Sequence, residues 1–214
     1  LTETGPTGPF DGWPLGRGYD RFYGFLDAET DQYSPEVVRD NSHVTAPGTY
    51  WTGYHLTEDL VDNAITYLAE HTAGAPDAPW MMTLAPGACH APHQAPIDYI
   101  NRCETYYKDG WDAARERRLA RQIELGIVPP GTPMPPRNDF VFPWEDIPSE
   151  QKPLSIRLMA AYAAMLEHFD DHFARVIQHL EASGQLENTV VLVMSDNGAS
   201  QEGGAFGFIN AMGP

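Results

Sequence analysis

The chain has 214 residues, 42% of them hydrophobic and 11% aromatic, so it can bury a sizeable core and wholesale disorder is excluded. Its 30 acidic residues outnumber its 13 basic ones and give a formal net charge of −17, which argues against a nucleic-acid or anionic-membrane surface. A small anionic substrate stays possible, because a local pocket can differ in charge from the whole protein.

The cysteine count and the hydropathy exclude further classes of protein. Two cysteines support neither a disulfide scaffold nor a zinc site of four cysteines. No apolar run approaches the ~20 residues of a membrane-spanning helix, and no signal peptide is visible. We therefore expect a soluble protein, with no preference among cytoplasm, periplasm and secretion in a bacterium. The sequence predicts no oligomeric state, and we expect natural termini beyond both Leu1 and Pro214.

The first part of the chain predicts a loop-rich start, a helix and a strand. Residues 1–55 are rich in glycine, proline and aromatics and favour an ordered loop with a short strand near Phe22–Leu26. Residues Leu56–Glu70 predict a helix with Thr57 as its N-cap and an apolar face at helical spacing. The apolar run Pro79–Ala85 is short and bounded by turn residues, so it favours a buried strand.

The second part predicts two helices and a central strand. A loop at 88–96 carries two histidines, and Asp109–Leu125 is a charged helix. The proline-rich stretch Pro129–Pro148 predicts an extended excursion on the surface. Lys152–Glu181 is the longest helix, and Asn188–Ser195 is β-branched and apolar on both faces, as in a central strand of a sheet.

The order helix, strand, helix, strand favours an α/β fold with at least partly parallel strands. In such sheets ligands bind outside the carboxyl ends of the strands. Polar residues stand at both of these ends: His90 and His93 follow the first strand, and Asp196 and Asn197 follow the second. This coincidence predicts a functional site at that edge of the sheet.

Asp196 and Asn197 are candidate metal ligands. A carboxylate beside an amide oxygen suits a hard cation such as Ca²⁺ or Mg²⁺. Gly198 allows the backbone to turn so that both side chains face one point. Asp-Asn-Gly is also ordinary turn chemistry, so the pattern alone leaves a purely structural role open.

His90 and His93 are candidate catalytic residues. An imidazole titrates near neutral pH, so it can protonate a leaving group or contact an anion. The alternative is a pair of loop histidines that bond to the backbone. We interpret the neighbouring Cys89 as a small core residue.

His168 and His172 stand four residues apart on the longest predicted helix, which could supply half of a zinc site. The order of residues is not that of a metalloprotease His-Glu-x-x-His motif, and further ligands are not apparent. The pattern therefore favours a solvated flank of the helix over a metal site.

Seven short segments, spread over nearly the whole chain, carry a family resemblance. They are Gly18–Phe25, Gly53–Thr57, Ala85–His93, Asp109–Asp112, Arg121–Gly126, Tyr162–His168 and Asn188–Ala199. In this order and at these separations they resemble the large bacterial arylsulfatases of the formylglycine-dependent sulfatase family, within the alkaline-phosphatase-like superfamily.

The resemblance implies an α/β fold that is part of a three-layer sandwich with a mostly parallel central sheet. It also implies hydrolysis of a small-molecule sulfate ester. Asp196 and Asn197 match a pair of calcium ligands of the family. His93 matches the histidine that contacts the sulfate and is proposed to protonate the leaving oxygen, and His90 is its neighbour.

The chain also departs from the family pattern. The family nucleophile is a formylglycine made from the cysteine of a Cys-x-Pro-x-Arg or related motif, and neither Cys89 nor Cys103 stands in one. We therefore expect residues 1–214 to be part of a sulfatase catalytic domain, with the nucleophile upstream and a further part downstream, and to be inactive alone. Two alternatives stay open: a phosphonate or phosphate ester hydrolase of the superfamily, and a non-catalytic fragment that binds calcium weakly.

Overall fold

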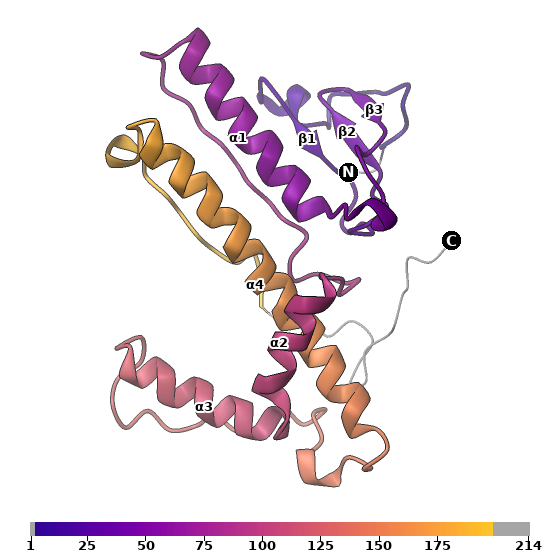
Figure 1. The fold of residues 1–214 in the computed structure, drawn as a ribbon, viewed down its shortest axis with the longest axis vertical. Helices are drawn as coiled ribbons and strands as arrows, with labels where there is room; N and C mark the ends of the chain where they lie inside the picture. The colour runs from indigo at the N-terminus through magenta and orange to yellow at the C-terminus, as the bar shows by residue number, and fades with distance from the viewer. Residues whose placement is uncertain (1–2, 199–214) are drawn as a thin grey trace.

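The computed structural model describes residues 3–198, which form four α-helices and one three-stranded antiparallel sheet of order β1-β2-β3 (Figure 1). The helices are α1 (Leu56–Gly74), α2 (Ile97–Tyr107), α3 (Gly110–Glu124) and α4 (Lys152–Ala182), and the strands are β1 (Tyr23–Gly24), β2 (Val37–Arg39) and β3 (Ser42–Val44). Helices α1 and α4 lie side by side, with the sheet near α1, while α2 packs against α4 and leads into α3 (Figure 1).

The three predicted helices are confirmed within a few residues at their ends. Helix α1 begins at Leu56 as predicted, but its N-cap is His55 and not Thr57. The His55 Nδ1 atom accepts a hydrogen bond from the Thr57 backbone N–H at 3.2 Å, which satisfies a donor that the first helical turn leaves open. Helix α4 ends at Ala182, and Gly184 follows with a φ of +71°, as its role as a stop signal predicts.

Helix α2 is absent from the sequence prediction. It follows Pro96 directly and buries Cys103, with Tyr99 and Ile100 partly buried beside it. These side chains pack against the small residues Ala160 and Ala164 of α4. The small alanine side chains allow α2 and α4 to approach closely. The sequence pattern of α2 alone does not reveal this packing surface on α4.

The small sheet confirms the short strand predicted near Phe22–Leu26, as β1, and adds β2 and β3. Strand β2 buries Val37 and Val38, and the β2–β3 turn places Asp40 at a φ of +57°. The Asp40 carboxylate accepts a hydrogen bond from the Phe22 backbone N–H at 3.0 Å. Strands of two or three residues are too short for an alternating pattern to show in the sequence.

The expected mostly parallel central sheet is not formed by residues 3–198, and this corrects the sequence prediction. Segment 79–85 makes no strand pairing there, although Trp80, Met82 and Leu84 point toward the α1–α4 core in alternation with exposed neighbours. Segment 189–195 is likewise unpaired, and Val190, Leu192, Val193 and Met194 are 77–85% exposed. Each segment runs back along the helix that precedes it (Figure 1). A strand needs a hydrogen-bonding neighbour, and in the described part of the chain β1–β3 do not pair with either segment.

The proline-rich stretch at 129–148 runs over the surface, as predicted, and is fastened to α3. The Asp112 carboxylate accepts a hydrogen bond from the Trp144 backbone N–H at 2.8 Å and pairs with Arg137 at 2.9 Å. Trp144 begins a short 3-10 helix, Trp144–Asp146. None of the described helices combines the length and apolar character needed to cross a bilayer.

Candidate functional site

The loop at 87–96 carries both predicted histidines and is held by neighbours distant in the sequence. Gln94 accepts a hydrogen bond from the Gln32 backbone N–H at 2.7 Å and donates one to the Asp31 carboxylate, also at 2.7 Å. At Gly87 an added Cβ would lie 2.6 Å from Nε2 of the buried Gln32 side chain, so the loop and the N-terminal region are in close contact, and a larger residue would require Gln32 to move. These contacts give the histidines a defined position.

His90 points back toward its own loop and toward the N-terminal region. Its Nδ1 lies 2.8 Å from the Ala91 carbonyl oxygen and 3.4 Å from the Glu29 carboxylate. Because a carbonyl oxygen only accepts, Nδ1 carries the hydrogen, and in the neutral ring the lone pair is on Nε2.

His93 is half-buried between the loop and α4. Its ring packs edge-on against the ring of Tyr162, with centroids 5.2 Å apart and planes at 74°. The structure thus brings His90 and His93 into one loop beside α4. The catalytic roles of both residues stay predictions.

Asp196 and Asn197 touch each other at the end of segment 189–195. The Asn197 Nδ2 donates to the Asp196 carboxylate at 2.9 Å, and the Ser195 hydroxyl donates to the Asn197 carbonyl oxygen at 2.6 Å. Both side chains are exposed. Turning the amide over would present its oxygen beside the carboxylate, a donor set that fits a hard cation. The calcium assignment stays a prediction.

The two cysteines are packed, not reactive. Burial raises the pKa of the Cys103 thiol to about 11 and also raises that of Cys89. Both residues contribute to the core between α2 and α4. Since the thiolate is the reactive form, neither environment favours modification or nucleophilic attack.

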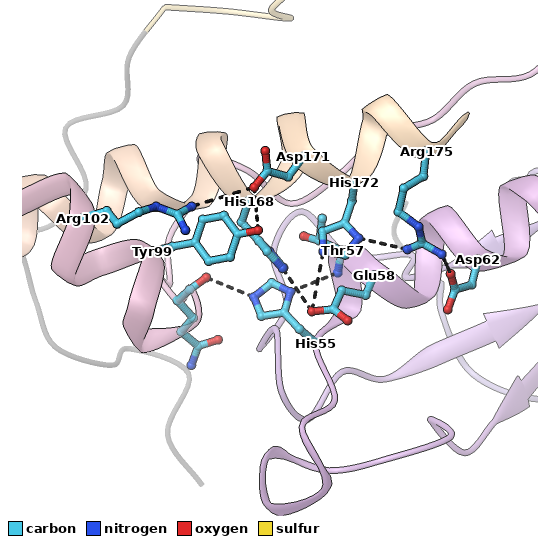
Figure 2. A network of polar contacts seen from close by, with 11 residues as sticks. His55, Thr57, Glu58, Asp62, Tyr99, Arg102, His168, Asp171, His172 and Arg175 are labelled. Atoms are coloured by element: carbon cyan, nitrogen blue, oxygen red, sulfur yellow. Dashed lines mark hydrogen bonds and ion pairs between the residues drawn. The ribbon is translucent and has the colours of Figure 1, made fainter. Parts of the chain in front are cut away.

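A cluster of Glu58, His168 and His172 joins α1 to α4 (Figure 2). The Glu58 carboxylate lies 3.1 Å from His168 Nε2 and 3.7 Å from His172 Nε2. His168 is only 1% exposed, so the prediction of a solvated flank is wrong for this residue. The i, i+4 spacing of the two histidines was the sequence signal for a metal site. Glu58 lies 110 residues from His168 in the sequence and meets the histidines only when α1 packs on α4.

Aromatic rings enclose His168. The ring of His55 lies 4.5 Å from it and the ring of Tyr99 lies 4.9 Å from it, both edge-on. Burial, and secondarily a neighbouring imidazole, lowers the pKa of both His55 and His168 to about 4. Both rings are therefore neutral at pH 7.

Charged residues surround this cluster on both helices (Figure 2). Arg175 donates to His172 Nδ1 at 3.0 Å and forms an ion pair with Asp62 of α1. On the other side, Tyr99 donates to Asp171 at 2.7 Å. Polar contacts thus flank the cluster and join α4 to α1 on one side and to α2 on the other.

Comparison with known proteins identifies relatives over most of the chain. The sulfatase family model matches residues 3–211. An arylsulfatase of Klebsiella aerogenes is 25% identical over 205 residues, which are 90% of this chain and 42% of that protein. An uncharacterized sulfatase of Schizosaccharomyces pombe is 42% identical over 113 residues, 52% of this chain and 20% of that protein. An uncharacterized sulfatase of Escherichia coli, YdeN, is 25% identical over 191 residues, 89% of this chain and 24% of that protein. The chain therefore spans less than half the length of each of these relatives.

Proposed function

The chain belongs to the sulfatase family, and on that premise we propose that it is part of the catalytic domain of an arylsulfatase, a calcium-dependent hydrolase of sulfate monoesters. The observation that carries the proposal is the loop at 87–96, which presents two histidines from a position held by Asp31, Gln32 and α4. The similarity to the Klebsiella arylsulfatase over 90% of the chain supports the choice of an aryl sulfate as substrate.

His93 is the proposed proton donor to the oxygen that leaves the sulfate. Its packing against Tyr162 restrains the ring, so a proton on it can be delivered along one direction. His90 is the proposed neighbour that contacts the sulfate or assists the transfer. Its Nδ1 contacts the Ala91 carbonyl oxygen and the Glu29 carboxylate, which hold the ring in place.

Asp196 and Asn197 are the proposed calcium ligands. Their oxygens match the preference of a hard cation, and a cation bound there offsets the negative charge of the sulfate oxygens. Ca²⁺ takes about six to eight oxygens, so this pair supplies a minority of its ligands.

The family's formylglycine does not fit either cysteine of this chain. Cys103 is buried in α2, Cys89 packs against the same core, and neither stands in the modification motif. We therefore assign no nucleophilic step to these residues.

The proposal is tested by ester hydrolysis with the full-length protein. We expect turnover of 4-nitrophenyl sulfate to exceed that of 4-nitrophenyl phosphate, to stop on chelation and to return with Ca²⁺. His93→Gln should slow an alkyl sulfate by about 100- to 10,000-fold, the range of general acid catalysis, and 4-nitrophenyl sulfate by less, because a good leaving group needs little protonation. His71→Gln, in a histidine of α1 outside the loop, should leave both rates unchanged.

Three results would contradict parts of the proposal. Faster phosphate than sulfate turnover would favour the phosphate ester hydrolase instead. Equal losses on both sulfates in His93→Gln would remove the proton-donor role. A folded full-length protein that hydrolyses neither ester would overturn the enzymatic proposal as a whole.

A further inference from the structure

We infer that Glu58, His168 and His172 form a binding site for a divalent transition metal of the zinc class, which bridges α1 and α4. This site is separate from the proposed calcium site and does not rest on the proposed function. It follows from the positions, chemistry and burial of three side chains.

The ligand atoms lie close to the spacing that a small tetrahedral metal requires. One nitrogen or oxygen from each residue lies within 4.8 Å of the other two. The two distances to the Glu58 carboxylate oxygen are 3.1 Å from His168 Nε2 and 3.7 Å from His172 Nε2. Zinc bonds to nitrogen and oxygen of about 2.0–2.1 Å at tetrahedral angles place neighbouring ligand atoms about 3.3–3.4 Å apart. Small side-chain shifts would bring all three atoms onto one ion.

The chemistry of the three ligands selects the class of metal. Two imidazoles and one carboxylate bind zinc in many proteins, with the fourth position open to water. Imidazole favours zinc, copper and nickel, whereas Ca²⁺ and Mg²⁺ prefer sets of oxygen ligands. The site should therefore take up zinc in the presence of excess calcium.

His168 is held in one orientation by its surroundings. It is 1% exposed, enclosed by the rings of His55 and Tyr99, and its Nδ1 has no hydrogen-bond partner among the described residues. Its Nε2 faces Glu58, and because a carboxylate only accepts, the hydrogen of the neutral ring lies on Nε2 and moves to Nδ1 when Nε2 binds the metal. Glu58 and His172 are partly exposed, which gives an ion a path from solvent.

Arg175 opposes metal binding at His172. It donates to His172 Nδ1 at 3.0 Å, so the hydrogen of the neutral ring lies on Nε2, where the metal would bind. Binding through Nε2 moves that hydrogen to Nδ1, and Arg175 must then release His172 while its ion pair with Asp62 is retained. Removing the guanidinium should strengthen binding.

The test is calorimetric titration of Zn²⁺ into chelator-treated full-length protein in excess Ca²⁺. We expect one zinc per chain at this site. Glu58→Gln and His172→Gln should each weaken binding by more than about 100-fold, because even outer partners of metal ligands contribute about 10- to 100-fold. Arg175→Gln should tighten it by about 10-fold or more, since glutamine can accept the Nδ1 hydrogen. Glu70→Gln and His71→Gln, in a carboxylate and a histidine of α1 outside the cluster, are the controls.

Two readouts keep the inference independent of catalysis. Co²⁺ in the same site should show the intense visible absorption of tetrahedral coordination, and circular dichroism should show that each variant is folded. If the folded protein binds no zinc, or if Glu58→Gln and His172→Gln bind it as tightly as the wild type, the site does not exist. Sulfate ester hydrolysis with Ca²⁺ would be unaffected by that outcome, so the two proposals fail separately.

Discussion

The α1–α4 helix pair and segment 189–195 are both rich in valine and leucine, yet they differ completely in burial. Val61 and Leu68 of α1 pack against Val176 and Leu180 of α4 and are almost fully buried. Segment 189–195, by contrast, exposes most of its apolar side chains on both faces. Apolar composition alone therefore does not decide which of these segments is buried.

The difference lies in where the backbone finds its hydrogen bonds. A helix satisfies its own peptide groups and needs only a packing surface, which α1 and α4 supply to each other. A strand needs neighbours on its edges before its side chains can pack, and no such neighbour is present among residues 3–198 for segment 189–195. A continuous apolar run is typical of a strand with neighbours on both sides. Segment 189–195 has this sequence pattern, but it pairs with no strand among the described residues.

Matched leucine truncations should show the largest contrast between the two regions. Leu68 is 2% exposed in the core between α1 and α4, so Leu68→Ala should lower the free energy of unfolding by about 2–5 kcal/mol. Leu192 is 77% exposed, so Leu192→Ala should change it by no more than about 0.5 kcal/mol. Urea denaturation of both variants measures the contrast.

The same pair of variants can also break the comparison. A loss in Leu192→Ala as large as that in Leu68→Ala would mean that segment 189–195 is packed in the protein. Its strand neighbours would then come from outside the described residues.

A charge in the exposed segment should reduce aggregation without a large effect on stability. Unpaired apolar strands are templates for pairing between molecules, and Val193→Lys would interrupt the apolar run. We expect lower light scattering on incubation and a change of less than about 0.5 kcal/mol in the free energy of unfolding.

Leu125→Lys is the matched control, because Leu125 is also exposed but follows helix α3 and lies in no extended apolar segment. Equal suppression of aggregation by both variants would show that net charge, and not the unpaired segment, controls it.

The proline-rich stretch at 129–148 differs from both regions, because a side chain of α3, Asp112, accepts a hydrogen bond from its backbone. Partial burial of Asp112 opposes its ionisation, but the hydrogen bond from Trp144 and the ion pair with Arg137 outweigh this and lower its pKa below 3.8. The folded state therefore binds this proton less tightly than the unfolded chain. The resulting stabilisation is present above about pH 3.8 and is lost as the pH falls through the lower folded pKa.

Asp112→Asn should lower the free energy of unfolding by only about 0.2–1 kcal/mol at pH 7, as for a partly exposed ion pair. The melting temperatures of wild type and variant, measured from pH 7 to pH 2.5, should converge below pH 3.8. A difference that stays constant with pH would assign the effect to the hydrogen bond geometry and not to the charge.

Much of the helical framework can be predicted from the sequence, because an amphipathic helix repeats apolar residues at a regular local spacing. The apolar spacing and end signals of Leu56–Glu70 and Lys152–Glu181 predict α1 and α4 to within a few residues. The ordered segments shared with the sulfatases likewise identify the family, which the match over residues 3–211 confirms. The roles of His90, His93, Asp196 and Asn197 rest on that resemblance and stay predictions.

Only the tertiary structure decides which distant residues meet. His168 and His172 are visible in the sequence as a spaced pair, but their burial and their contact with Glu58 depend on the packing of α1 against α4. The apolar patterns at 79–85 and 189–195 predict strands equally well whether or not a neighbour exists. The spacing of side chains along a segment depends only on the local sequence. A hydrogen-bonding strand neighbour or a third metal ligand lies far away in the sequence, and its position depends on how the whole fold packs.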